Sequence, residues 1–185
     1  MLASSRKYCI LVSDFNLLKG VQMTNSEIEA FFLKAMRSGY AGGGVGKTMT
    51  PPDVRPSTKE IRFVDGDWLL IDEWNVNRDT NKSTGVTRIW HDGTLVWFMS
   101  YGGYYPDELI RPLKKALRLT YEKGVFKGGR GETVGDFEAG VFYVNTVEHG
   151  DFSHFKGREE IVVRGPESCV GQTAGYHEYW GMSLI

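Results

Sequence analysis

Two segments of the chain carry apolar residues at the three- and four-residue spacing that is typical of an amphipathic helix. The first begins at a capping box formed by Thr24 and Glu27, and Gly39 is suited to end it as a left-handed C-cap. Its apolar stripe consists of Ile28, Phe31, Phe32, Ala35 and Met36. The second helix is expected from about Pro112, which suits a first helical turn, to Gly124, and its stripe consists of Leu113, Ala116, Leu117 and Tyr121.

Alternating apolar and polar residues elsewhere in the chain predict β-hairpins. Residues 61–64 and 67–73 flank Asp65-Gly66, and residues 86–91 and 94–101 flank Asp92-Gly93; both dipeptides favour type I′ turns. With Asp92-Gly93 as a two-residue loop, the expected pairs are His91 with Thr94, Trp90 with Leu95, Ile89 with Val96 and Arg88 with Trp97.

This register predicts two apolar faces for the second hairpin. One face carries Arg88 surrounded by Trp90, Leu95, Trp97, Met99 and Tyr101, and the other carries Ile89, Val96 and Phe98. Because both faces are apolar, we expect both to be covered, or one of them to line a cavity.

A shift of 72 residues aligns parts of the chain with each other and suggests an internal duplication. It matches Gly85, Ile89, Gly93, Gly103 and Tyr104 with Gly157, Ile161, Gly165, Gly175 and Tyr176. Each predicted helix is also followed by a glycine-rich segment and then by strands. The alternative is a pair of unrelated hairpins with similar turn residues.

These patterns together predict one α+β domain over residues 1–185. Residues 1–23 form a leading arm or strand, and residues 24–104 and 105–185 form two α-then-β-hairpin halves. We expect the antiparallel strands to form one strongly bent sheet or two facing sheets, with the helices covering the outer faces.

Composition excludes several classes of protein. The 185 residues are 41% hydrophobic and 24% charged, which indicates a folded globular protein, and no apolar run is long enough to cross a membrane. A net charge of -1 gives no general attraction to nucleic acids or anionic membranes.

We interpret Lys114, Lys115 and Arg118 as a solvated face of the second helix. Cys9 and Cys169 form no disulfide or zinc motif, and the apolar run beginning at Cys9 is too short for a signal peptide, so a cytoplasmic location is expected.

Several short motifs occur together in order: Tyr40-Ala41-Gly42, Arg55-Pro56, Asp65-Gly66-Asp67-Trp68, Gly93 with Val96-Trp97-Phe98-Met99, and Gly150-Asp151-Phe152 through Phe155, Gly157 and Ile161. In these motifs the chain resembles a bacterial family, domain of unknown function 5680, over about residues 28 to 182. The resemblance implies a sensor domain, since the family's domain often follows a helix-turn-helix segment in transcriptional regulators. Only about 25 residues precede the first predicted helix here, so no such segment is expected. The resemblance implies no particular catalytic residues.

Residues 41–48 imitate a phosphate-binding loop, and residues 69–73 imitate a Walker B strand. A phosphate-binding loop must open a helix whose N-terminal amides face the phosphates. Pro51, Pro52 and Pro56 follow this loop and prevent such a helix, so we expect no ATP binding.

The four histidines give no clear site. His149 and His154 lie near Glu148, but their spacing across a turn and a strand does not require them to converge, so we expect no metal and no other cofactor. His91 and His177 have no partner that the sequence identifies, and we interpret them as surface or hydrogen-bonded residues.

The most promising ligand site is an aromatic cleft between the halves, lined by Arg88, Trp90, Trp97, Tyr101, Trp68 and Glu160. Glu160 corresponds to Arg88 in the 72-residue shift and is its expected partner. This site favours a non-enzymatic domain that binds or senses an apolar or aromatic small molecule. The same aromatic residues are alternatively core, or the surface of an interaction module that binds a protein partner or a second copy. Another alternative is an enzyme that acts on a small molecule through Asp72, Glu73, Glu148 or His154.

Overall fold

The computed structural model describes residues 23–41, 48–51, 53–136, 138–165 and 170–185. Its elements, in chain order, are α1 (Asn25–Met36), the π-helical turn η1 (Arg37–Ala41), β1 (Thr48–Met49), β2 (Thr58–Asp65), β3 (Trp68–Val76), β4 (Lys82–His91), β5 (Thr94–Tyr104), the 3-10 turn η2 (Asp107–Leu109), α2 (Ile110–Lys123), β6 (Val134–Asp136), β7 (Val141–Asp151), β8 (His154–Arg164) and β9 (Gly171–Ser183). The predicted leading arm and most of the loop that imitates a phosphate-binding loop lie outside the described residues.

The strands of the described residues form one antiparallel sheet in the order β1-β2-β3-β4-β5-β9-β8-β7-β6. The first predicted half is therefore a helix followed by a meander of five strands, β1 to β5, and the second is a helix followed by a meander of four, β6 to β9. The two meanders meet at their last strands, β5 and β9, which pair over Trp97 to Tyr104. The predicted α+β class is confirmed.

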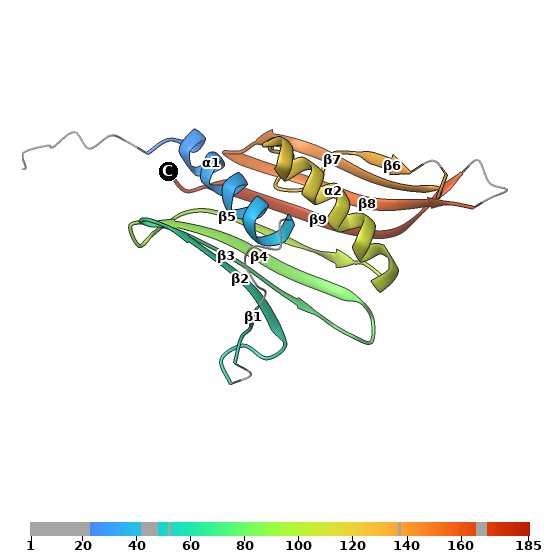
Figure 1. Ribbon diagram of the computed structural model, residues 1–185, viewed down its shortest axis with the longest axis horizontal. Coiled ribbons are helices and arrows are strands. Elements are labelled where there is room, and N and C mark those ends of the chain that lie inside the picture. Colours follow the sequence, from blue (N-terminus) through green and yellow to red (C-terminus); the bar gives the residue numbers. More distant parts are fainter. Residues whose placement is uncertain (1–22, 42–47, 52, 137, 166–169) are drawn as a thin grey trace, which may run out of the picture.

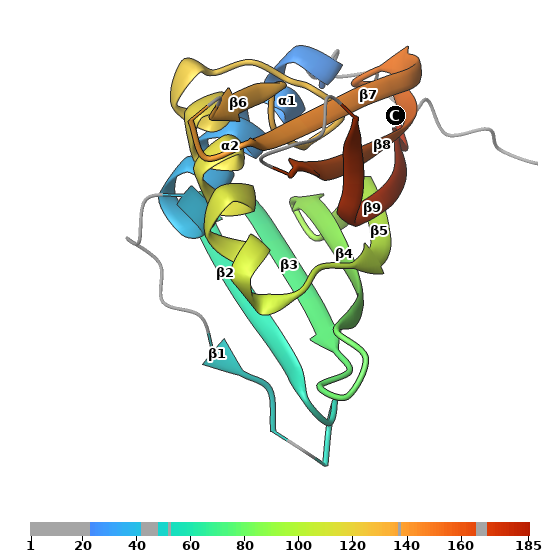
Figure 2. The ribbon, with the colours of Figure 1, turned by 90° about the vertical axis from the view of Figure 1, so that its right-hand side faces the viewer.

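Both helices lie on the same face of the sheet, which curves around them (Figures 1 and 2). The expectation that the helices cover outer faces is wrong, because the apolar stripes of both helices share one core with the inner face of the sheet. Phe32 of α1 shows this directly: its ring lies 5.1 Å from that of Trp97 and 6.2 Å from that of Tyr121. In the part of the chain that the structure describes, neither helix is long and apolar enough to cross a membrane.

The helix ends follow local signals with one exception. Thr24 and Glu27 form the predicted capping box, and Gly124 ends α2 in the left-handed conformation with φ 68°. Gly39 does not cap α1, because the chain continues into η1. A Cβ at Gly39 would lie 2.7 Å from a methyl carbon of Ile61, so this glycine permits close packing against β2.

The two predicted turns differ in outcome. Asp92 and Gly93 both have positive φ and connect β4 to β5 as the type I′ prediction requires. In the first hairpin Asp65 pairs with Trp68, so the loop is Gly66-Asp67, one residue later than predicted.

Two tyrosine–glycine pairs flank the middle of the sheet. Tyr101 and Tyr179 pair across β5 and β9. Each tyrosine also pairs with a glycine on its other side, Gly85 on β4 and Gly157 on β8. A Cβ on either glycine would lie 2.3 Å from an atom of the tyrosine side chain. Both glycines therefore make room for a ring that lies across the neighbouring strand.

We expect Gly157→Ala to destabilise the fold by about 1–3 kcal/mol, because its Cβ would also approach the backbone oxygen of Thr146 to 2.5 Å. Gly102→Ala is the matched control, since its Cβ would lie 3.2 Å from the nearest atom. Urea unfolding of both variants measures the difference. Equal losses would show that the ring does not need the space at Gly157.

Candidate functional site

A β-bulge separates the residues that were predicted to line a common cleft. Trp90 pairs with Leu95 as predicted, but one extra residue in β5 then shifts the register, so that Ile89 pairs with Trp97. Since successive strand residues point to opposite faces, this shift turns Trp97 into the core with Ile89 and leaves Arg88 on the outer face. The prediction that Arg88 and Trp97 share a face is wrong.

The aromatic residues on the inner face are packed against other side chains. Trp97 has no exposed surface, stacks on Phe152 at 5.2 Å and donates a hydrogen bond to the Phe152 carbonyl oxygen. Tyr101 is buried and donates to Asp72 Oδ1 at 3.0 Å. Trp68 stacks on Phe31 of α1 at 5.0 Å. These contacts are those of core residues.

The predicted polar partners on the outer face are also separate. Arg88 forms an ion pair with Glu73 at 2.9 Å, whereas Glu160 accepts a hydrogen bond from Thr173 at 2.7 Å. Following the paired residues across the sheet from Arg88 leads through β5 and β9 to His154 on β8. Glu160 lies six residues, or about 20 Å, further along β8. Arg88 and Glu160 therefore do not pair.

The acidic residues and histidine proposed for an enzyme do not form one site. Asp72 is buried on the inner face and its neighbour Glu73 points to the outer face. Glu148 lies 3.5 Å from Lys156, and the ring of His154 packs against that of His149 at 5.8 Å. These side chains occupy different surfaces of the sheet.

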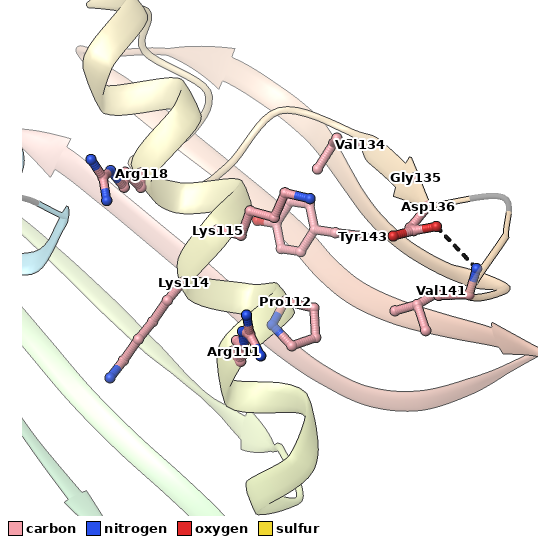
Figure 3. A pocket seen from close by; sticks show the side chains of 11 residues that line it. Arg111, Pro112, Lys114, Lys115, Arg118, Val134, Gly135, Asp136, Val141 and Tyr143 are labelled. Atoms are coloured by element: carbon pink, nitrogen blue, oxygen red, sulfur yellow. Dashed lines mark hydrogen bonds between the residues drawn. The ribbon is translucent and has the colours of Figure 1, made fainter.

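A groove of about 740 Å³ lies between α2 and the β6–β7 hairpin (Figure 3). We call it the α2 groove. Its apolar lining includes Pro112, Val134, Val141 and the ring of Tyr143. Its polar lining is mostly basic and includes Arg111, Lys114, Lys115 and Arg118, with Asp136 opposite.

The basic side chains of the groove differ in direction and in pairing. Figure 3 shows Lys115 extending from α2 towards β6 and β7, whereas Lys114 and Arg118 extend from the far side of the helix. Arg118 pairs with Glu122 at 2.7 Å. Among the residues that the structure describes, no acidic side chain forms an ion pair with Arg111, Lys114 or Lys115. The groove therefore has cations available for an anionic ligand.

A buried polar cluster lies directly behind the groove. The Tyr143 hydroxyl donates to Glu159, a carboxylate with no exposed surface that also forms an ion pair with the buried Arg130. Nδ1 of His177 lies 3.2 Å from Glu159 Oε1, and Nε2 of His177 lies 2.8 Å from the Ser83 hydroxyl. Three strands and one loop thus meet at a single carboxylate.

Glycines bring Arg130 into the core. Gly128 and Gly129 have positive φ, which glycine adopts without strain. A Cβ at Gly128 would lie 2.5 Å from the Tyr179 ring, and one at Gly131 would lie 2.8 Å from the Tyr143 ring. The loop can therefore press against the inner face only because these positions lack side chains.

The cluster shifts the protonation of its members. Burial alone would raise the pKa of Glu159, but the charge of Arg130 and hydrogen bonds from His177 and Arg130 outweigh it and hold this pKa at about 2. Burial lowers the pKa of His177, and its contact with Glu159 offsets only part of that effect. At neutral pH the cluster therefore contains an ionised Glu159 and an uncharged His177.

Sequence patterns missed this cluster because its members are far apart in the chain. Ser83, Arg130 and His177 occur in no motif, and only the Gly-Gly-Arg-Gly sequence around Arg130 is unusual. A charged residue between such glycines is a signal that the loop packs closely against another part of the protein.

Comparison with protein families matches residues 76–176 to the model of domain of unknown function 5680. The chain belongs to this family. The match covers the whole lining of the α2 groove, together with Ser83, Arg130 and Glu159, and ends one residue before His177. No curated protein and no solved structure matches the chain.

We expect Arg130→Met to cost about 3–5 kcal/mol of stability, because it leaves Glu159 buried without its cation. Adding Glu159→Gln should restore more than half of this loss, since the remaining carboxamide is neutral. Arg158→Met, which removes the half-buried partner of the exposed Glu178, should have a smaller effect. Urea unfolding tests the series, and a double variant no more stable than Arg130→Met would contradict the role of charge.

The buried His177 should make the protein less stable in mild acid. Unfolded chains take up a proton on this histidine near its ordinary pKa of 6.5, but the folded protein does so only at a lower pH. Stability is therefore lost as pH falls from about 7 towards 5, at no more than about 1.4 kcal/mol per pH unit. The low pKa of Glu159 extends the loss from about pH 4.5 towards 2.

Comparison with His177→Gln isolates the contribution of the histidine. Burial raises the pKa of Asp72, which acts in the opposite direction as pH falls, but this contribution is present in both proteins. We expect unfolding free energies between pH 7 and 5 to fall less steeply in the variant. The same slope in both proteins would contradict the lowered pKa.

Proposed function

We propose that this protein is a sensor domain that binds a small amphipathic anion in the α2 groove without altering it chemically. The observation that carries the proposal is a groove of ligand size, with an apolar lining and basic side chains that have no acidic partner among the described residues. Small-molecule sites commonly have volumes of about 300–1,000 Å³ and a few polar groups within an apolar lining.

The lining suggests how such a ligand is held. Val134, Val141 and the Tyr143 ring offer apolar contacts, and Lys115 and Arg111 offer positive charge at the α2 side. Asp136 on the opposite side accepts a hydrogen bond from the Ala139 amide and would repel a second anionic group. The ligand class is therefore a compact apolar or aromatic body with a single acidic end.

Comparison of the two halves also supports the α2 groove as the ligand site. Tyr101 donates to Asp72 in the first half, and Tyr179 donates to Asn145 in the second, at matching positions of the two meanders. A smaller cavity of about 450 Å³ lies between α1 and the β2–β3 hairpin, where Lys34 pairs with Asp65 and Trp68 packs on Phe31. We infer that the halves arose by duplication and that, of these two cavities, the α2 groove is the one that has cations without an acidic partner among the described residues.

The cluster behind the groove gives a sensor a means of response. Tyr143 contacts the groove with its ring, donates to Glu159 and accepts a hydrogen bond from the Gly131 amide at 2.9 Å. A ligand that moves this ring changes the support of both the glycine loop and the buried ion pair.

Binding of 8-anilinonaphthalene-1-sulfonate, a fluorescent aromatic anion, tests the site. We expect the double variant Arg111→Ala, Lys115→Ala to raise its Kd at least about tenfold, because charge-assisted contacts are lost. The matched control Lys123→Ala, Lys156→Ala removes two exposed cations outside the groove and should leave the Kd unchanged.

A neutral analogue, N-phenyl-1-naphthylamine, separates charge from apolar contact. Its affinity should change little in the groove variant, since it has no anionic group for Arg111 or Lys115 to bind. Equal Kd values for the sulfonate in the groove variant and the control variant would contradict the proposed site.

A further inference from the structure

We propose that Ser83, His177 and Glu159 form a nucleophilic serine site that reacts with activated acyl esters. This proposal concerns a second site and a chemical activity, and it does not depend on ligand binding in the α2 groove. The three side chains lie in series, with 2.8 Å between Ser83 Oγ and His177 Nε2 and 3.2 Å between His177 Nδ1 and Glu159 Oε1.

The sheet register explains how these residues meet. Ser83 on β4 pairs with Gly103 on β5, Gly103 pairs with His177 on β9, and His177 pairs with Glu159 on β8. The serine hydroxyl and the imidazole meet across β5 at Gly103, where a Cβ would lie 2.2 Å from the Tyr176 carbonyl oxygen. Gly103 therefore permits the close approach of β9 that brings His177 to Ser83.

One hydrogen bond and one close polar contact bear on which atoms carry protons: Ser83 and His177 Nε2 are hydrogen-bonded, whereas His177 Nδ1 lies 3.2 Å from Glu159 Oε1 without hydrogen-bond geometry. Ionised Glu159 can only accept, so the Nδ1 that faces it carries the hydrogen of the neutral imidazole. In this tautomer Nε2 has a free electron pair, and the Ser83 hydroxyl donates to it at 2.8 Å. This is the arrangement in which histidine acts as a general base towards serine and a carboxylate fixes its tautomer.

The surroundings hold the base and leave the nucleophile accessible. The His177 ring packs edge-on against Tyr105 at 4.7 Å and lies 5.6 Å from the Tyr101 ring. Glu159 is held by Arg130 and Tyr143. His177 and Glu159 are buried, whereas Ser83 is partly exposed at the start of β4. The proposed reaction requires a reagent to approach from the exposed side of Ser83 while the imidazole stays packed in place.

The reaction proceeds in two balanced steps. Ser83 Oγ attacks the ester carbonyl carbon while His177 Nε2 takes the hydroxyl proton; the bond to the leaving alkoxide then breaks and Nε2 gives it the proton. Water next attacks the acylated serine, its proton passes through Nε2 to Ser83 Oγ, and the carboxylic acid leaves. The substrate class is a small acyl group on a good leaving group, because such esters require the least stabilisation of the oxyanion.

A fluorophosphonate carrying a fluorophore tests the nucleophile, since it forms a stable bond to an activated serine and releases fluoride. We expect one label on the folded full chain, located at Ser83 by peptide mass spectrometry, and no label on Ser83→Ala. Ser100→Ala is the matched control, because Ser100 lies on β5 with its neighbours Val86 and Trp180, and it should label like the parent.

His177→Gln tests the base and should slow labelling at least about 100-fold, as expected when a general base is lost. Circular dichroism and unchanged binding of 8-anilinonaphthalene-1-sulfonate verify that the variants are folded. Hydrolysis of p-nitrophenyl acetate should show a burst of one equivalent that is absent in Ser83→Ala. No labelling of the parent, or labelling that persists in Ser83→Ala, would overturn the proposal.

Discussion

The ion pair between Arg130 and Glu159 is the interaction on which the rest of the second half depends. Moving a carboxylate and a guanidinium out of water costs several kcal/mol per ion, and their attraction offsets this only with good geometry and further hydrogen bonds. Tyr143 and His177 supply hydrogen bonds or close contacts to the same carboxylate. The loop after α2 must therefore enter the core, and its glycines, the Tyr143 ring and the position of His177 are all fixed by that requirement.

The first half meets a similar constraint with less charge. Asp72 is also buried, but it is satisfied by the hydroxyls of Thr87 and Tyr101, and burial raises its pKa. At the matching position the second half has Asn145, which accepts from Tyr179 and donates to the carbonyl oxygens of Lys127 and Gly131. The neutral side chain thus anchors the glycine loop that carries Arg130. Both halves consist of a helix followed by an antiparallel meander. Their buried polar residues differ at the point where the glycine loop enters the core.

Sequence patterns predicted features that depend on neighbouring residues. The capping box at Thr24, the cap at Gly124 and the turn at Asp92-Gly93 each satisfy backbone groups within a few residues, so their signals are local. The bulge in β5 has no such local signal. It depends on how the side chains of β5 pack against β9 and the helices, which are distant in the sequence. Without the bulge, alternation alone places Trp97 beside Arg88, and the predicted cleft follows from that error.

The candidate sites required the same long-range information. Lys115 lines a groove only because the β6–β7 hairpin lies opposite it. His177 meets its partners only because β9 lies between β5 and β8. Glu159 contacts Tyr143 on one side and His177 on the other, so one carboxylate lies between the groove and the Ser83–His177 pair. Charges interact strongly in such a poorly hydrated interior, so a small displacement of Tyr143 alters the hydrogen-bonding environment of Glu159.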